Sequence, residues 1–320
     1  MTTPTPLLIL GVRRSGTTLL RVMLDRNPEL ALPDESYFLP QLAHRHGDRP
    51  DADAFLDDVR RLPTLREWGI SAADVQARVR PGLTLGELIG AIYEAYAAKA
   101  GKERWGDKTP MYMQHLGLLE RLFPTARYVH LIRDGRDAAL SFLAMPSGVV
   151  TESWHHPRTV ADFACQWRTE VAAARALGRR VRGRYREVRY EHLVAEPDAE
   201  LRAICDFAEL PFDPLMLDYA GNVDLRAKPH QQSLAKPPTV GLRDWRAAMS
   251  DPDVRAFEEV AGDLLAGLGY ELRHPDLERG PSPRGRARLA RYAALGAAWR
   301  TTAYAIQRSP MWRRRHPPLD

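Results

Sequence analysis

Two glycines followed by a helix start near the N-terminus could bind a phosphate group. Gly11 and Gly16 have the G-x4-G spacing of a phosphate-binding loop, between the apolar run Leu7–Leu10 and a helix expected from Thr17. Glycines let the backbone turn sharply so that several N–H groups face one anion, and a helix N-terminus adds partial positive charge. The spacing therefore predicts an anion cradle. The alternative is a plain glycine-containing turn between a strand and a helix.

The other residues of this loop differ from those of nucleoside triphosphatases. Those proteins follow the second glycine with Lys, which reaches the terminal phosphates, and with Ser or Thr, whose hydroxyl holds Mg²⁺. Here Thr17 takes the Lys position, and Arg13 and Arg14 supply cations from within the loop. The pattern indicates transfer of a group that needs no magnesium. No His or Cys cluster has metal-ligand spacing, so we expect no metal site.

An acid and a base in two later turns are further candidates. Glu35 follows the short apolar stretch 30–32, and residues just past the carboxyl ends of parallel strands line the ligand crevice of an open sheet. Glu35 would then face the same crevice as the loop; alternatively, it is an N-terminal helix acid favoured by the helix dipole. Lys108 lies in a tight frame between Gly106 and Pro110, which makes it a candidate anion contact.

An arginine and a serine later in the chain have a spacing that could hold a second phosphate. Arg133 ends the expected strand 127–133, and Ser141 lies about two turns into the next helix, on the side that faces the strand end. A guanidinium and a hydroxyl so placed can share one phosphate. The alternative is an ordinary arginine at a helix start and an ordinary helix serine.

Together these segments resemble sulfotransferases that use 3′-phosphoadenosine 5′-phosphosulfate (PAPS). Residues 13–19 resemble their 5′-phosphosulfate loop, and residues 133–141 resemble their 3′-phosphate motif, about 120 residues further on. Residues 34–35 and 108–110 resemble the tyrosylprotein and carbohydrate branches of the family. The resemblance covers roughly residues 7–270.

The resemblance implies a role for each candidate. In those branches a Glu matching Glu35 is the catalytic base, and a Lys matching Lys108 contacts the transferring sulfuryl group. Arg14 would stabilise charge beside Lys108, and Tyr190 matches a tyrosine that lies near the adenine. The donor-binding residues expected on this basis are Arg13, Arg14, Ser15, Gly16, Thr17, Thr18, Arg133, Ser141, Tyr190 and Lys236.

The chain also departs from parts of the family pattern. Cytosolic members close a basic loop with an Arg-Lys-Gly start over the 3′-phosphate; residues 236–245 occupy that place here, with Lys236 as the expected contact. The His base of the cytosolic branch has no match, because Pro110 follows Lys108 and Thr109. The membrane anchor and paired cysteines of the Golgi enzymes have no match either, which counts against secreted-protein acceptors.

Length and composition are those of a globular protein. The chain has 320 residues, 44% hydrophobic and 27% charged, and the expected fold is α/β, with a P-loop-like central parallel sheet between helices. Its two cysteines read as buried residues in a reducing compartment, so we expect a cytoplasmic protein. Strands are expected at 7–10, 127–133 and 186–190, and helices at 17–24, 52–61, 84–99, 113–122, 136–145, 159–179, 199–208 and 254–268.

The charge is concentrated at the C-terminus. Residues 279–320 contain ten arginines and one acid, so the remainder carries about −4, which argues against nucleic-acid binding. We therefore divide the chain into a catalytic domain, 1–278, and a basic tail, 279–320, with a linker at 279–285 and an amphipathic helix at 286–307. That helix either packs on the body or on a second subunit, or lies on anionic lipid at the inner face of a membrane.

The function expected from these features is sulfuryl transfer from PAPS to an acceptor hydroxyl on a small molecule, a lipid or a carbohydrate. The reaction would be an in-line displacement with Glu35 as base. Two alternatives remain. A P-loop small-molecule kinase would use a similar loop, although the Lys after Gly16 is missing. A non-catalytic nucleotide-binding module would keep Arg133 and Ser141 but need neither Glu35 nor Lys108.

Overall fold

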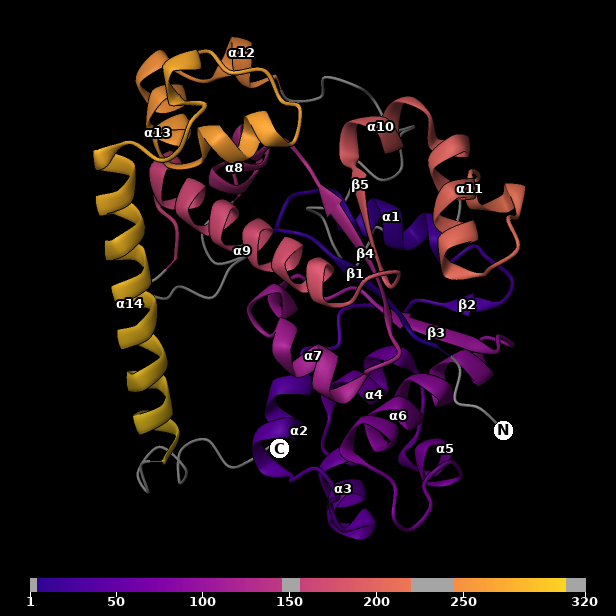
Figure 1. The fold of residues 1–320 in the computed structure, drawn as a ribbon. Helices are drawn as coiled ribbons and strands as arrows, with labels where there is room; N and C mark the ends of the chain where they lie inside the picture. The colour runs from indigo at the N-terminus through magenta and orange to yellow at the C-terminus, as the bar shows by residue number, and fades with distance from the viewer. Residues whose placement is uncertain (1–4, 146–155, 220–243, 309–320) are drawn as a thin grey trace.

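A five-stranded parallel sheet forms the centre of the molecule. The computed structural model describes residues 5–145, 156–219 and 244–308 (Figure 1). All four strand pairings are parallel, in the order β2-β3-β1-β4-β5, which confirms the expected fold class. The strands are β1 (Leu7–Leu10), β2 (Leu30–Ala31), β3 (Arg104–Asp107), β4 (Arg127–Ile132) and β5 (Tyr185–Arg189).

The central strand β1 is buried on both faces. Successive side chains of a strand point to opposite sides, so Leu8 and Leu10 enter one hydrophobic core while Leu7 and Ile9 enter the other. A strand covered on both faces reads as a continuous apolar run. Four consecutive apolar residues therefore fit the central strand, and the loop that follows them, residues 11–16, starts at the middle of the sheet.

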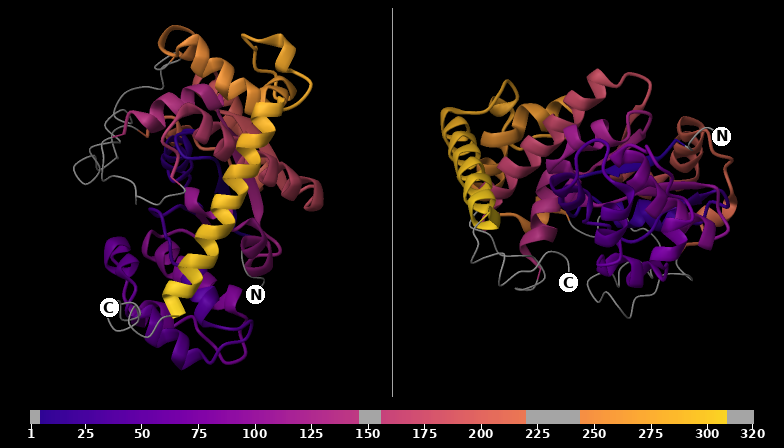
Figure 2. Two further views of the ribbon diagram at one scale, coloured as in Figure 1. Left: turned by 90° about the vertical axis from the view of Figure 1, so that its left-hand side faces the viewer. Right: turned by 90° about the horizontal axis from the view of Figure 1, so that it is seen from below.

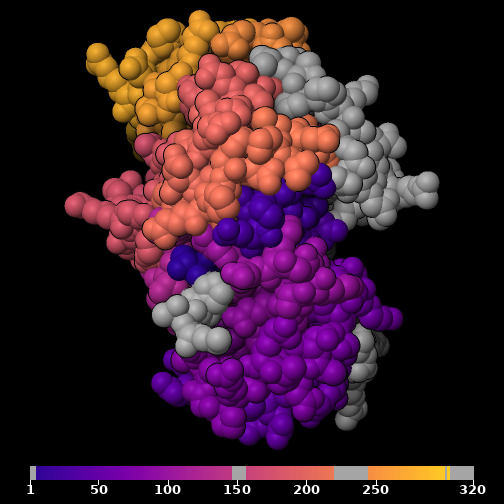
Figure 3. Space-filling model, turned by 90° about the vertical axis from the view of Figure 1, so that its right-hand side faces the viewer, coloured from indigo at the N-terminus to yellow at the C-terminus, as the bar shows by residue number. Residues whose placement is uncertain are grey.

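Helices cover both faces of the sheet (Figure 1). Figure 3 shows the orange surface of α11 beside the indigo surface of α1, on the side opposite α14. The smaller of the two cores lies under α1 (Thr17–Leu24), α10 (Tyr190–Ala195) and α11 (Pro197–Ala208). The larger core includes α6 (Leu85–Lys99), α7 (Leu116–Leu122), α8 (Gly135–Leu143), α9 (Val160–Arg180) and α13 (Asp251–Gly267).

A layer of short helices between β2 and β3 extends the larger core. Their buried side chains include Phe55, Leu65, Trp68 and Val75. Ser71 and Thr84 form capping boxes at the starts of α5 and α6, which satisfy the first backbone N–H groups of those helices. The helices of this layer are α2 (Leu39–Arg45), α3 (Ala52–Val59), α4 (Pro63–Trp68) and α5 (Ala72–Gln76).

Two expectations about local structure were wrong. Residues 104–107 form the strand β3, where a bend fixed by Gly106 and Pro110 was expected. A Cβ at Gly106 would overlap the backbone oxygen of Leu7, so glycine lets β3 lie beside β1. The helix expected from residue 113 starts at Leu116, because a 3-10 helix, η1 (Pro110–Gln114), precedes it.

The basic C-terminal segment forms one long helix, α14 (Pro283–Arg308), so the expected linker is shorter than 279–285. Figure 2 shows this helix running along one side of the molecule, from α13 toward the helices between β2 and β3. Leu289 and Tyr292 pack against the larger core, and Arg288 pairs with Glu259 of α13 at 3.5 Å. Within the described ranges, no helix is both long and apolar enough to cross a bilayer.

Candidate functional site

The loop between β1 and α1 turns sharply at two residues with left-handed backbone. Arg14 and Gly16 are both left-handed, with φ of 69° and 90°, and the N–H of Ser15 donates to the oxygen of Val12 at 3.0 Å. A Cβ at Gly16 would overlap the ring of Tyr190, which covers the loop from α10. Glycine is therefore required here both for its positive φ and for the close approach of an aromatic ring.

Glu35 and Lys108 meet beside this loop. The Nζ atom of buried Lys108 donates to Glu35 Oε1, and also to Thr18 Oγ1 at 3.3 Å. Glu35 keeps 21% of its side chain exposed, and the hydroxyl of Tyr37 donates to it as well. Glu35, Lys108 and Thr18 come from three separate segments of the sequence. They place a carboxylate, an ammonium group and a hydroxyl together at the start of α1.

The second predicted phosphate motif reaches the same loop from β4 and α8. Nη1 of Arg133 donates to the main-chain oxygen of Arg14 at 3.2 Å, and Nε of Arg14 donates to Ser141 Oγ at 2.9 Å. The guanidinium of Arg133 lies 4.6 Å from the centre of the Tyr190 ring. The structure therefore brings together Arg14, Arg133, Ser141 and Tyr190.

Two buried polar atoms of this site have no hydrogen-bond partner in the part of the chain that the structure describes. They are Ser15 Oγ and Arg133 Nε. Leaving a buried donor unpaired costs about 1–3 kcal/mol, more for a charged group. Both atoms can donate to an anion, so the site fits a ligand that carries phosphate or sulfate groups.

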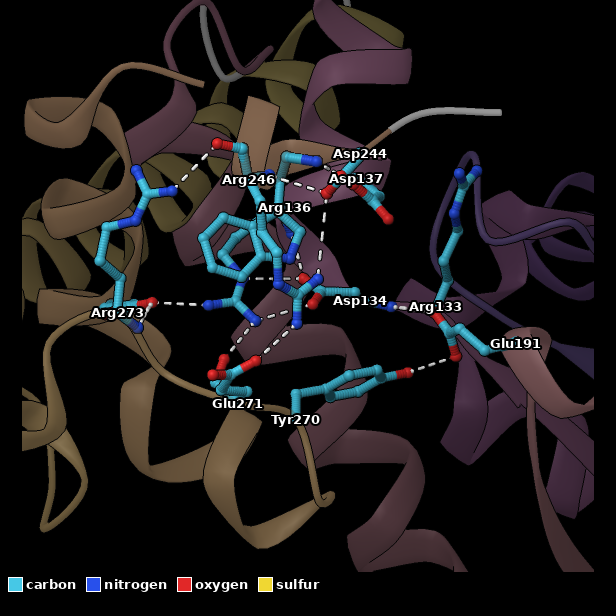
Figure 4. Close-up of polar contacts among 12 residues, drawn as sticks. Arg133, Asp134, Arg136, Asp137, Glu191, Asp244, Arg246, Tyr270, Glu271 and Arg273 are labelled. Carbon is cyan, nitrogen blue, oxygen red and sulfur yellow. Dashed lines mark hydrogen bonds and ion pairs between the residues drawn. The ribbon is translucent and has the colours of Figure 1, made fainter. Parts of the chain in front are cut away.

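The chain just after β4, where Arg133 lies, is held by a polar network (Figure 4). The N–H of Asp134 donates to Glu191 Oε1 at 2.9 Å, and the hydroxyl of Tyr270 donates to Glu191 Oε2 at 2.9 Å. These bonds connect β4 with α10 and with the chain after α13. They hold Arg133 beside the loop.

Arg136 is a supporting residue that sequence reasoning missed. Its fully buried guanidinium pairs with Asp134 at 2.7 Å and with Glu258 at 2.6 Å, and lies 3.6 Å above the ring of Trp245 (Figure 4). A buried charge is tolerated only when it is paired. The two acids close to Arg136 in the sequence were the available signal. Asp134 pairs with it, and Asp137 accepts from the main-chain N–H of Trp245 at 2.8 Å.

Arg13 faces a different buried acid. Its charge, together with the amides of Gln166 and Gln114, opposes the effect of burial on Glu170, yet burial still raises the pKa of Glu170 to about 7. Gln166 Nε2 donates to Glu170 Oε1 at 2.8 Å. Arg13 thus acts electrostatically on Glu170 of α9, while Arg14 bonds directly to Ser141 of α8.

The remaining predicted residues are placed as follows. Thr17 is buried at the first position of α1. Lys236 lies outside the described residues. In the described part of the chain, no group of three His, Cys, Asp or Glu side chains could hold a metal ion.

The fold agrees with comparisons to known proteins. A family model described as "Sulfotransferase family" matches residues 6–214. The nodulation protein NoeE of Sinorhizobium fredii is 32% identical over 92% of this chain and 74% of its own length. Protein-tyrosine sulfotransferase A of Caenorhabditis elegans is 27% identical over 82% of this chain and 66% of its own.

A solved structure gives the same assignment. The sulfotransferase domain of the Synechococcus PCC 7002 olefin synthase superposes with a TM-score of 0.56 and 26% identity, over 85% of this chain and 97% of that domain. The family match covers most of the chain, including the loop, Glu35, Lys108, Arg133, Ser141 and Tyr190. The chain therefore belongs to the sulfotransferase family.

Proposed function

We propose that this protein transfers the sulfuryl group of PAPS to a hydroxyl of an acceptor molecule. One observation carries the proposal: Lys108 joins Glu35 to Thr18 at the start of α1. A carboxylate that can accept a proton therefore lies next to a cation and to an anion-binding helix N-terminus. A protein that only bound nucleotides would have no need for this pair of side chains.

The two ends of the donor fit two parts of the site. The main-chain N–H groups of residues 14–18 are suited to the 5′-phosphosulfate, and Arg133 with Ser141 is suited to the 3′-phosphate. The buried Ser15 Oγ and Arg133 Nε atoms support this assignment, because each can donate to a phosphate or sulfate oxygen. Tyr190 lies against both Gly16 and Arg133, where its ring could contact the adenine.

The chemistry that follows is an in-line displacement. Glu35 accepts the proton of the acceptor hydroxyl, whose oxygen forms a bond to sulfur while the bond from sulfur to the bridging phosphate oxygen breaks. The electron pair of that bond leaves with adenosine 3′,5′-bisphosphate. Lys108 and Arg14 stabilise the negative charge that develops on the sulfuryl oxygens and on the leaving phosphate.

The acceptor we propose is a hydroxyl on a small molecule, a lipid or a carbohydrate. One relative is named a protein-tyrosine sulfotransferase, so a tyrosyl peptide belongs in the test as a further class. We also propose a cytoplasmic location, with the basic tail at the inner face of a membrane or in a homodimer. The two cysteines are buried and unpaired, which supports a reducing compartment.

The test is transfer of label from [³⁵S]PAPS to four acceptor classes: an aryl alcohol, a tyrosyl peptide, an oligosaccharide, and a lipid extract. We expect transfer to at least one class in the presence of EDTA. A parallel reaction with [γ-³²P]ATP and Mg²⁺ tests the kinase alternative. Phosphate transfer from ATP, with no sulfuryl transfer from PAPS to any class, would contradict the proposal.

A further inference from the structure

A buried polar cluster lies directly behind Glu35 and Lys108. All its side chains are buried, and three of its members, Ser36, Asp107 and Thr109, adjoin Glu35 or Lys108 in the sequence. Polar side chains are uncommon in a protein core unless their hydrogen bonds are satisfied there. We name this group the Asp107 cluster; it consists of Ser36, Tyr93, Asp107, Thr109 and Tyr112.

One carboxylate oxygen is the centre of the cluster. Oδ2 of Asp107 accepts from Ser36 Oγ at 2.8 Å, from Tyr93 Oη at 2.9 Å and from Thr109 Oγ1 at 3.2 Å. Three donors on one oxygen orient that carboxylate strongly. They also join the chain after β2, the helix α6 and the chain after β3.

Ser36 is held by its main chain as well as by its hydroxyl. Its N–H donates to Thr109 Oγ1 at 3.0 Å, its carbonyl accepts from Thr64 Oγ1 at 3.3 Å, and its hydroxyl lies 2.7 Å from Tyr112 Oη. With the bond to Asp107, all its polar groups are engaged. The backbone next to Glu35 therefore has little freedom to move relative to η1.

The cluster continues the contact between β2 and β3 beyond the end of the sheet. The two strands pair at Leu30 with Arg104 and at Ala31 with Trp105. Past that point, side chains of the Asp107 cluster link residue 36 to residues 107 and 109 in place of backbone bonds. The linked residues are direct sequence neighbours of Glu35 and of Lys108. Because consecutive Cα atoms are about 3.8 Å apart, the link lies close to both of these residues.

The arrangement is costly for a purely structural feature. Burial raises the pKa of Asp107 to about 6, although three hydrogen bonds and the charge of Lys108 act in the opposite direction. An apolar set of similar volume is often as stable as a buried polar one, or more stable. Tyr93 already packs well without its hydroxyl, since its ring stacks on Trp105 at 4.4 Å. The role of the hydroxyl is therefore its hydrogen bond to Asp107.

We propose that the Asp107 cluster positions Glu35 relative to Lys108 for sulfuryl transfer, with Ser36, Tyr93, Asp107 and Thr109 acting as positioning residues. This inference rests on the function proposed above. The cluster sets the place of the base relative to the cation that meets the sulfuryl group. Misplacement of a catalytic group by about 1 Å can cost roughly 100-fold in rate. Donor binding, which depends on the loop and on Arg133, should be insensitive to the cluster.

The first test is Tyr93→Phe, which removes one hydrogen bond to Asp107 and keeps the stacked ring. We expect the turnover number, measured with [³⁵S]PAPS and the fastest acceptor of the panel, to fall about tenfold. The dissociation constant of adenosine 3′,5′-bisphosphate, measured by calorimetry, should change less than twofold. The matched control is Tyr128→Phe: Tyr128 is also buried and donates to a carboxylate, Glu120, at 3.0 Å. It should leave both quantities unchanged.

A second variant guards against a general effect on folding. Thr109→Val removes the hydroxyl and keeps the shape, whereas Thr109→Ser restores the hydroxyl. Turnover should fall with Val and recover with Ser, while both variants bind the bisphosphate normally. Loss of turnover only in proportion to loss of folded protein, followed by circular dichroism, would overturn the inference.

A double-mutant cycle shows whether the effect passes through Glu35. In a Glu35→Gln background there is no base to position, so adding Tyr93→Phe should lower the rate less than twofold. An equal loss in both backgrounds would overturn the inference and leave the proposed function intact. If Glu35→Gln alone turned over like the wild type, the proposed base would be wrong, and the inference would fall with it.

Discussion

The Nε atom of Arg14 donates to the hydroxyl of Ser141 at 2.9 Å, although the two residues are 127 positions apart. This bond joins the first loop of the chain to α8. Arg133 adds a second link through the main-chain oxygen of Arg14. The parts of the site suited to the 5′ and 3′ groups of the donor are therefore joined by direct hydrogen bonds.

Replacing Arg133 with Gln should weaken binding of adenosine 3′,5′-bisphosphate by about 1.5–3 kcal/mol, as expected for a charge-assisted hydrogen bond. Binding of AMP, which lacks the 3′-phosphate, should change much less. The control is Arg202→Gln, because Arg202 also lies over an aromatic ring, that of Phe212, at 3.9 Å. Calorimetry that gave the wild type equal affinity for AMP and the bisphosphate would refute this prediction.

Replacing Glu35 with Gln keeps the shape of the side chain and removes its ability to accept a proton. Donor binding should survive, and single-turnover sulfuryl transfer should slow by roughly 10²–10⁴-fold. Glu29→Gln, a change of the same kind at an exposed residue near β2, is the control. An unchanged rate for Glu35→Gln would remove the base from the mechanism.

Replacing Gly16 with Ala should abolish tight bisphosphate binding, because a methyl group there meets the Tyr190 ring. The matched control is Gly101→Ala. Gly101 also has a positive φ, 70°, but a Cβ there would enter open space. Both variants should lose about 1–2 kcal/mol of stability from the left-handed backbone, and the Gly16 variant should lose more in a denaturant titration. Similar losses for the two would mean that the ring moves aside easily.

His130 should contribute less to the stability of the folded protein as the pH drops below about 6.5. Burial lowers the pKa of this β4 residue to about 3, so between about 3 and 6.5 the unfolded chain binds a proton there that the folded chain does not. The stability advantage of the wild type over His130→Gln should therefore shrink by about 2 kcal/mol between pH 7.5 and pH 5. Urea titrations at the two pH values measure it. A constant difference would contradict the prediction.

A chain that ends at Arg279 should fold and bind the bisphosphate, because the described donor-site residues precede that point. It should be less stable by about 1–3 kcal/mol, since it lacks the packing of Leu289 and Tyr292 on the larger core. The full chain should sediment with anionic vesicles at low salt and be released as salt rises, as expected for a basic helix. If the shortened chain also bound the vesicles, the attraction to anionic lipid would come from another part of the protein surface.

Local patterns predicted most of the fold. Apolar runs and hydrophobic periodicity gave the types and approximate positions of β1, β4, α1 and α6. β3 was missed because its burial comes from neighbours distant in sequence: Gly106 fits against Leu7, and no local pattern shows that.

The candidate site was predictable where the chemistry lies in short motifs. Arg133 and Ser141 follow from spacing, and Glu35 and Lys108 from their places after strands. The Asp107 cluster was not predictable. Its members lie in three separate segments, around residues 36, 93 and 107–112, and include two tyrosines, Tyr93 and Tyr112, that read as ordinary core aromatics. Only the folded chain shows that their hydroxyls converge.

The order of strands in the sheet has a consequence for how the chain is made. β1 precedes both of its sheet partners in the chain: Leu7 pairs with Gly106 of β3 on one side and with Arg127 of β4 on the other. A nascent chain on the ribosome therefore carries an unpaired strand of four apolar residues until β3 and β4 have both emerged. Such long-range pairing slows folding, and an exposed strand edge invites aggregation in the meantime. We expect the yield of soluble protein to depend on chaperones that hold this first segment.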